Sequence, residues 1–200
     1  MPAPMKKIFD IAEKHDLFVI EDCAHALGAE YRGKPAGSFG HAAFFSFGRD
    51  KVVSSVFGGV LAIRSDLVAE RVREHYSARA LPARAWVLRV LLHPVLTAFF
   101  KKTYHWRGIG KIGLAAALLA RILPCAVTEE EKQGGKPDFT SKKMAPSIAR
   151  LILRQLEKLE RFNTHRLAIA TVYRETIRSK KIKHPRVPTD RQSIFLRYTV

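Results

Sequence analysis

Short apolar runs alternate with amphipathic helical patterns over the first 80 residues, and this alternation restricts the possible folds more than any other feature. Apolar side chains recur at helical spacing in residues 4–16. Apolar runs typical of strands follow at residues 17–20, 41–47 and 58–65, and the first is predicted to be buried. A second helix is predicted over residues 66–80. Helices that alternate with strands indicate an α/β layer built on a sheet.

The composition changes after this part of the chain. From His75 to Thr128 there are eight lysines and arginines but no aspartate or glutamate. Two apolar runs fall here, and cations interrupt both before 18 residues, so a membrane-spanning helix is not expected. Two interpretations stay open. Residues 84–126 either form a helical hairpin buried against the protein or a partner subunit, or lie as interfacial helices on an anionic membrane.

The last third of the chain begins with a polar stretch. Residues 128–143 are predicted to form a loop. Residues 144–177 carry a continuous apolar stripe and predict one long helix. Residues 180–200 predict a loop followed by a strand, within which the sequence stops.

The bulk properties favour a folded protein in a reducing compartment. The chain has 200 residues and is 47% hydrophobic, which is enough for a core of one domain or a domain and a half. Cys23 and Cys125 lie far apart, so neither a disulfide scaffold nor a metal site is predicted. Residues 1–18 contain acids and no uninterrupted apolar core, so no signal peptide is expected. A cytoplasmic protein is predicted, with a peripheral position on the inner face of the membrane as a further option.

The net charge of +17 calls for an anionic partner or surface. Nucleic acid, an anionic membrane and an acidic protein are the general candidates. Nucleic acid is disfavoured, because the cations alternate with apolar helix faces and are not gathered with stacking aromatics and glycines.

Three chemically useful side chains are predicted at one edge of the sheet. Asp22 follows the first apolar strand, and Ser46 and Lys51 lie at the end of the next. Ligands of open α/β sheets bind at the carboxyl ends of the strands. A pyridoxal phosphate (PLP) site needs a carboxylate facing the pyridine nitrogen, a hydroxyl for the phosphate and a lysine that forms the Schiff base. These residue types in this order therefore favour a PLP site.

The stretch from Val19 to Ile63 resembles the core of the DegT/DnrJ/EryC1/StrS aminotransferases, the sugar-nucleotide branch of fold-type I PLP enzymes. Their pattern is roughly E-D-x-A-[HQ]-A-x-G, three spaced glycines, F-S-F, a lysine five residues after the serine, and G-G. Each piece is weak alone, whereas the combined spacing is specific. The sequence matches at Glu21, Asp22, Ala24, His25, Ala26, Gly28, Gly33, Gly37, Gly40, Phe45, Ser46, Phe47, Lys51, Gly58 and Gly59.

The resemblance implies a fold and a division of the chain. The fold is α/β: part of the fold-type I large domain, with a mixed sheet and helices, followed by a long helix into an incomplete α+β small domain. Residues 1–80 would be part of the PLP-binding domain, residues 81–136 a basic apolar insert with a polar loop, and residues 137–200 the long helix and the start of the small domain. Family members are longer, so the chain is expected to be an internal piece of such an enzyme.

The resemblance also implies roles for four residues. Lys51 would bind the cofactor covalently and move protons, Asp22 would pair with the pyridine nitrogen, and Ser46 would contact the phosphate. His25 would lie against the cofactor ring or its phenolic oxygen. The structural alternatives are a surface lysine, a helix N-cap, a turn serine and a packed histidine, respectively.

Two pairs of residues flank Lys51 in the sequence. Arg49 and Asp50 depart from the small or histidine-containing residues that are frequent in the family, so they either alter the pocket or pair with each other at its rim. Gly58 and Gly59 are predicted to serve a turn that needs positive φ.

The implied activity is amino-group transfer from an amino acid to a keto-sugar linked to a nucleotide or a lipid, as in the biosynthesis of surface polysaccharides. A homodimer is implied for the full-length enzyme. The alternative is a catalytically inactive remnant, or a membrane-surface-binding protein on the same fold.

Overall fold

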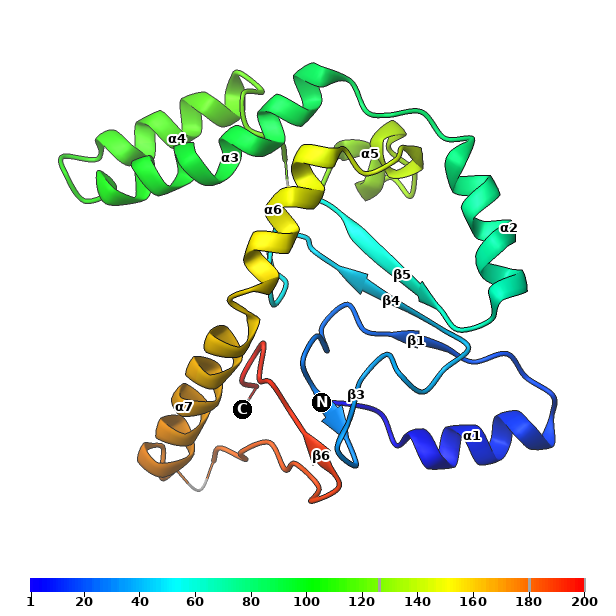
Figure 1. Ribbon diagram of the computed structural model, residues 1–200. Coiled ribbons are helices and arrows are strands. Elements are labelled where there is room, and N and C mark those ends of the chain that lie inside the picture. The colour runs from blue at the N-terminus through cyan, green and yellow to red at the C-terminus, as the bar shows by residue number, and fades with distance from the viewer. Residues whose placement is uncertain (126, 180, 200) are drawn as a thin grey trace.

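The computed structural model describes the whole chain except residues 126, 180 and 200 (Figure 1). Residue 126 ends the predicted membrane segment, and residues 180 and 200 begin and end the predicted tail, so these positions lie outside the described residues. In chain order the elements are α1 (Met5–Lys14), β1 (Ile20–Asp22), β2 (Glu30–Tyr31), β3 (Lys34–Pro35), β4 (Ala42–Ser46), β5 (Gly59–Ile63), α2 (Asp66–Ser77), α3 (Arg84–Lys102), α4 (Ile109–Leu119), α5 (Glu129–Lys132), a 3-10 turn (Asp138–Ser141), α6 (Pro146–Leu156), α7 (Leu159–Thr176) and β6 (Arg191–Gln192).

The larger sheet has the order β1-β4-β5 and is mixed, as expected. Strands β1 and β4 are parallel, with Asp22 opposite Phe44. Strands β4 and β5 are antiparallel, with Phe44 opposite Leu61. The parallel pair brings the carboxyl ends of β1 and β4 to the same edge, which is where the candidate site residues were predicted.

A second, small sheet joins the two ends of the chain. Strand β2 pairs antiparallel with β3 on one side and with β6 on the other. Figure 1 shows β6 near the amino terminus, and Arg191 of β6 donates to the carbonyl of Pro2 at 3.1 Å. Ile194, just after β6, is buried with Ala29 and Val52. The division of the chain at residues 80 and 136 stays a prediction.

The main core lies between the larger sheet and the helices that follow it. Ile148 and Ile152 of α6 are buried against Val53 and Val56, which belong to the loop between β4 and β5. Val90 of α3 is buried in the same cluster. The apolar stripe predicted for the long helix therefore packs on the loop that carries Lys51.

The prediction of one long helix over residues 144–177 is wrong, because α6 and α7 are separate helices (Figure 1). The amide of Lys158 donates to the carbonyl of Gln155, which tightens the last turn of α6 and ends it. The new direction allows Asn163 of α7 to reach the backbone of Leu27. The apolar period continues across the break, so the sequence pattern does not reveal it.

The first predicted strand is also displaced. Strand β1 begins at Ile20 and not at Leu17, and Leu17, Phe18 and Ile20 are more than half exposed. The reason is that β1 has one neighbour in this sheet, and Phe18 stacks on His41 at a centroid distance of 4.5 Å. The prediction that this run is buried is therefore wrong, apart from Val19.

The acid-free region forms two packed helices, α3 and α4, which point away from the rest of the molecule (Figure 1). Trp86, Val87 and Leu91 at the root of α3 pack against the main core. Among the described helices, none is long and apolar enough to cross a membrane. The polar stretch after the hairpin is not wholly a loop, because Thr128 and Glu131 form a capping box that starts α5.

Glu21 fixes the loop that precedes β4. Its carboxylate is buried and accepts three backbone N–H groups, from Gly37 at 2.8 Å and from Phe39 and Gly40 at 2.7 Å each. Hydrogen bonds to a charged acceptor are stronger than neutral ones, and three donors saturate much of the carboxylate. Glu21 therefore stabilises the fold beside the site.

We expect Glu21→Ala to lower the free energy of unfolding by about 2–4 kcal/mol, because it leaves buried donors without a partner. Glu21→Gln keeps one carbonyl oxygen and should cost less. Urea denaturation of the three proteins measures both differences. Equal stability of Glu21→Ala and the parent would contradict this account of the loop.

His93 of α3 makes stability depend on pH. Burial, followed by the positive charges of Arg49 and Lys101, lowers the pKa of His93 from its ordinary value of 6.5. The unfolded chain therefore takes up a proton more readily than the folded one as the pH falls. The contribution of neutral His93 to stability is complete above about pH 6.5 and is lost as the pH falls through the lowered pKa.

We therefore expect the free energy of unfolding of His93→Gln to fall less steeply than that of the parent as the pH drops below about 6.5. Urea denaturation at a series of pH values measures the two curves. Curves that stay parallel over this range would show that His93 is not responsible.

Candidate active site

The candidate site lies at the edge shared by the carboxyl ends of β1 and β4. Asp22 is the last residue of β1 and Ser46 is the last residue of β4. The amide of Cys23 donates to the carbonyl of Phe44 at 2.9 Å, which continues the pairing beyond Asp22. The two chain segments that leave this edge carry His25 and Lys51.

Lys51 and His25 meet across this edge. The distance between Lys51 Nζ and His25 Nε2 is 2.5 Å, although 26 positions separate the residues in the sequence. The Lys51 side chain is 16% exposed, and the Asp50 carboxylate lies 3.8 Å from its ammonium group. An amine held beside an imidazole can pass a proton to it, which a freely solvated surface lysine does not do.

Gly48 lies between Ser46 and Lys51, and a side chain there would meet only ordinary van der Waals contacts. A Cβ atom at Gly48 would lie 3.6 Å from Asp50 Oδ1, and 3.7 Å from both Lys51 Cγ and Ser46 Oγ. The amide of Gly48 donates to Ser46 Oγ at 3.4 Å. Ser46 thus accepts a hydrogen bond within the turn, as expected if it were only a turn serine. Its hydroxyl can still donate a hydrogen bond to a ligand.

Asp22 takes part in a turn and does not cap a helix. Its carboxylate accepts the amide of Ala24 at 2.9 Å, and turns follow it in the chain. The Asp22 side chain is exposed, and within the described residues it makes no hydrogen bond to Lys51 or His25. The helix N-cap alternative is therefore wrong, while its role toward a cofactor stays a prediction.

Cys23 lies beside the site, but its thiol is unreactive near neutral pH. Burial, with smaller contributions from the charges of Glu21 and Asp22, raises the pKa of the Cys23 thiol to about 11. The thiolate is the reactive form of cysteine, so Cys23 stays protonated and unreactive near neutral pH.

Helix α7 holds both loops of the site, which the sequence alone did not reveal. Asn163 Nδ2 donates to the carbonyl of Leu27 at 3.3 Å in the loop that carries His25. Arg166 donates to the carbonyl of Val52 at 2.8 Å, directly after Lys51, and to Asn163 Oδ1 at 3.1 Å. Burial lowers the pKa of Arg166, but a guanidinium stays charged at neutral pH.

Gly28 is needed for this arrangement. It has φ of +83°, and a Cβ atom there would lie 2.3 Å from Asn163 Nδ2. Residues with a side chain rarely adopt such a φ value, and they would also displace Asn163.

Arg49 and Asp50 do not pair with each other. Arg49 donates to the carbonyls of Pro124 and Cys125 at 2.5 and 2.7 Å, and its guanidinium lies over the ring of Phe57. Asp50 contacts Arg197 at 3.0 Å. Arg49 thus ties the loop that carries Lys51 to the segment after α4.

The two glycines before β5 serve different purposes. Gly58 has φ of +133°, as predicted for a turn. Gly59 has no positive φ, so that part of the prediction is wrong. Instead, a Cβ atom at Gly59 would lie 2.9 Å from the carbonyl oxygen of Phe45 on the neighbouring strand. Gly59 is therefore required by close backbone approach.

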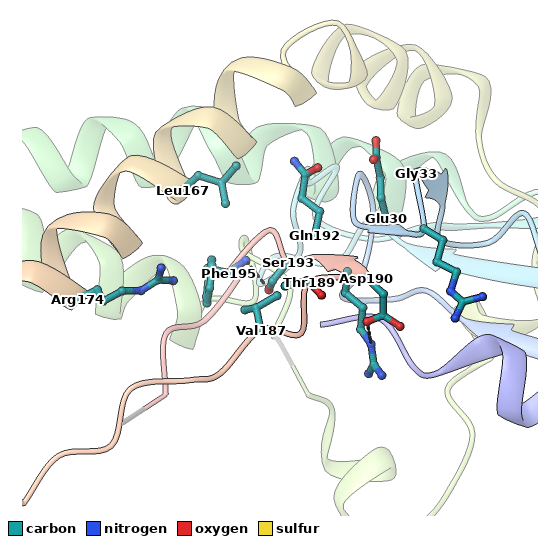
Figure 2. A pocket seen from close by; sticks show the side chains of 12 residues that line it. Glu30, Gly33, Leu167, Arg174, Val187, Thr189, Asp190, Gln192, Ser193 and Phe195 are labelled. Carbon is teal, nitrogen blue, oxygen red and sulfur yellow. Dashed lines mark hydrogen bonds and ion pairs between the residues drawn. The ribbon is translucent and has the colours of Figure 1, made fainter.

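Two cavities lie away from these residues. A pocket of about 440 Å³ lies between α7 and β6, and Figure 2 shows Leu167 and Arg174 on its helix side and Glu30 on its strand side. A groove of about 860 Å³ lies between β5, α2 and α6 and is mostly apolar. Neither is lined by Lys51 or His25, so the contact between these two residues locates the candidate site better than cavity volume does.

The donor set at the edge fits PLP. The aldehyde group of PLP forms a Schiff base with an amine. Lys51 supplies that amine, next to His25 as a proton acceptor. The aromatic nitrogen of the cofactor requires a carboxylate, and Asp22 lies at the same sheet edge with its side chain exposed. Within the described residues, no group of three or more His, Cys, Asp or Glu side chains could hold a metal ion.

The chain is similar to known proteins in both sequence and fold. Residues 1–88 match the sequence profile described as the DegT/DnrJ/EryC1/StrS aminotransferase family. A relative from Caulobacter vibrioides named GDP-perosamine synthase is 44% identical over 69 residues, which are 34% of this chain and 19% of that protein.

Solved structures share the fold over almost the whole chain. The aminotransferase TlmJ from Streptoalloteichus hindustanus superposes with a TM-score of 0.65 at 19% identity, over 98% of this chain and 42% of that one. A protein from Streptococcus pneumoniae, solved in its PLP form, superposes with a TM-score of 0.60 at 19% identity, over 98% of this chain and 44% of that one.

The chain thus spans less than half the length of these two solved proteins, and its match spans about a fifth of the curated relative. The profile match includes the whole predicted motif from Glu21 to Gly59. Residues 1–88 of the chain are therefore similar to the DegT/DnrJ/EryC1/StrS aminotransferase family.

Proposed function

We propose that this chain supplies the lysine-bearing part of a PLP-dependent aminotransferase that moves an amino group from an amino acid to a keto-sugar. The observation that carries the proposal is the 2.5 Å contact between Lys51 Nζ and His25 Nε2 at the carboxyl edge of the sheet. It lies within the segment that matches the family. The name of the Caulobacter vibrioides relative supports a sugar linked to a nucleotide as the acceptor. A lipid-linked sugar is the other option.

Four residues would hold the cofactor. Lys51 would bind it covalently, and Asp22 would face the pyridine nitrogen. Ser46 would donate to the phosphate, and His25 would lie against the ring or its phenolic oxygen. When bound, PLP supplies an electron sink that acidifies the Cα proton of the amino acid. The PLP form of the structural neighbour from Streptococcus pneumoniae supports this choice of cofactor.

The residues of the chain would manage the protons. A lysine amine must lose its proton before it can act as a nucleophile or a base. His25 Nε2 is within hydrogen-bond distance of Lys51 Nζ and can accept that proton. The negative charge of Asp22 would hold a proton on the ring nitrogen.

Helix α7 would keep this geometry. Asn163 and Arg166 attach to the loops that carry His25 and Lys51, respectively. Both loops are therefore held by one rigid element. Since a misplacement of about 1 Å can cost two orders of magnitude in rate, these two side chains would act as positioning residues.

The proposed function also includes the oligomeric state and the location of the full-length enzyme. We infer a homodimer in the full-length enzyme from the resemblance to the family. We infer a cytoplasmic location because amino acids and sugar nucleotides are the substrates proposed. A catalytically inactive remnant on the same fold is the competing function, and binding of the cofactor decides between the two.

We expect the chain with added PLP to show a visible absorbance band that is absent from Lys51→Ala. Lys7→Ala is the matched control, because Lys7 is an exposed lysine on α1. It should keep the band of the parent. Absorbance spectra of the three purified proteins measure this. A band that persists in Lys51→Ala would contradict the role of Lys51, and no band in any of them would favour the inactive remnant.

We expect His25→Gln to slow the appearance of this band at neutral pH by at least about tenfold, because Lys51 loses its proton acceptor. At high pH a lysine amine loses its proton without help, so the rates of His25→Gln and the parent should converge. Stopped-flow absorbance over a range of pH gives both profiles. A constant ratio at every pH would mean that His25 only packs against the site.

A further inference from the structure

The hairpin of α3 and α4 has no task in the proposed reaction. Among the described residues, the root of the hairpin packs in the main core, through Trp86, Val87, Val90 and Leu91. Within the hairpin, the turn between the two helices is the part that lies farthest from the sheet (Figure 1). Most of the described hairpin residues therefore lie outside the packed core of this chain.

Exposed apolar side chains line both helices. On α3, Leu88, Val95 and Phe99 are 58–63% exposed and recur at spacings of seven and four residues, which places them on one face. On α4, Ile112 and Leu119 are 70% and 85% exposed and also lie seven residues apart. Single exposed apolar residues are ordinary, but these five on one hairpin, recurring at helical spacing, indicate an interaction surface.

The turn between the helices carries amphipathic aromatic residues. Trp106 is 66% exposed and Tyr104 is 37% exposed. Tryptophan and tyrosine are enriched at the interface between membrane and water, where their rings lie at headgroup depth. Lys111 Nζ lies 5.0 Å from the centre of the Tyr104 ring, so a cation accompanies the aromatic group.

The charge of the hairpin has one sign. Seven cations on and beside it are exposed, and no acid occurs between Glu74 and Glu129. None of the described ion pairs uses them. They are Arg84, Arg89, Lys101, Lys102, Arg107, Lys111 and Arg121.

We propose that the α3–α4 hairpin docks on the surface of an anionic lipid bilayer, with Trp106 and the two apolar stripes at headgroup depth. Charge complementarity selects this occupant, because a surface that is both apolar and purely basic matches anionic headgroups above acyl chains. Nucleic acid would pair with the cations but would leave the apolar stripes in water. A second copy of this chain would bring seven like charges against seven more.

The experiment uses Trp86→Phe, in which Trp106 is the remaining tryptophan, and vesicles of phosphatidylcholine with or without phosphatidylglycerol. With anionic vesicles at low salt, Trp106 fluorescence should shift to the blue and be quenched by bromine on the acyl chains. Neither change should occur with phosphatidylcholine alone. Co-sedimentation of the parent chain checks that the substitution did not create the binding.

A charge-matched pair of variants tests the location. Lys101→Glu/Lys102→Glu should weaken binding to anionic vesicles by about tenfold or more, because each cation near the surface contributes to attraction. Arg150→Glu/Arg154→Glu changes the net charge equally on exposed positions of α6 and should have a much smaller effect.

Three results would overturn the proposal. The first is no vesicle binding at low salt, where electrostatic attraction is strongest. The second is binding without quenching of Trp106, which would mean adsorption by net charge alone. The third is a dimer in sedimentation velocity that Trp106→Ala abolishes while vesicle binding is unchanged, which would assign the surface to a second copy of the chain.

Discussion

The parallel pairing of β1 with β4 is the constraint on which the site depends. Parallel strands end at the same edge, so residues that leave β1 and β4 can meet there although they are distant in the sequence. Glu21 holds the loop that leads into β4, and α7 holds the loops that leave both strands. The contact between Lys51 and His25 is the result of these three restraints.

Much of this was accessible from the sequence, because the relevant signals are local. The motif from Glu21 to Gly59 places a carboxylate, a histidine, a serine and a lysine after successive strands, and β1, β4 and β5 form the predicted mixed sheet. The helices at residues 5–14 and 66–77 follow from their apolar spacing.

The errors and omissions have a common physical origin, since each depends on contacts between distant residues. The break between α6 and α7 interrupts no apolar period, and it is visible only because α7 turns toward Leu27. Glu21 belongs to the motif, but its buried role depends on amides 16 to 19 positions later in the chain. Asn163 and Arg166 act on backbone more than 100 positions away.

The molecule combines a site built from polar contacts with a hairpin that is apolar and basic. Arg49 connects them, because it follows the strand that ends at Ser46 and donates to the carbonyls of the segment after α4. If the hairpin binds a bilayer, this connection attaches the candidate site to the membrane-bound part of the chain. That arrangement would suit an acceptor sugar carried by a lipid, the second option for the substrate.

The central claim is that Lys51 is the residue that captures PLP, and reductive trapping tests it most directly. The chain would be incubated with PLP, reduced with borohydride and digested, and the modified peptide would be identified by mass spectrometry. The account predicts a modification at Lys51 that becomes much weaker in His25→Gln at neutral pH. Modification spread over exposed lysines, with Lys51 no more reactive than the others, would contradict it.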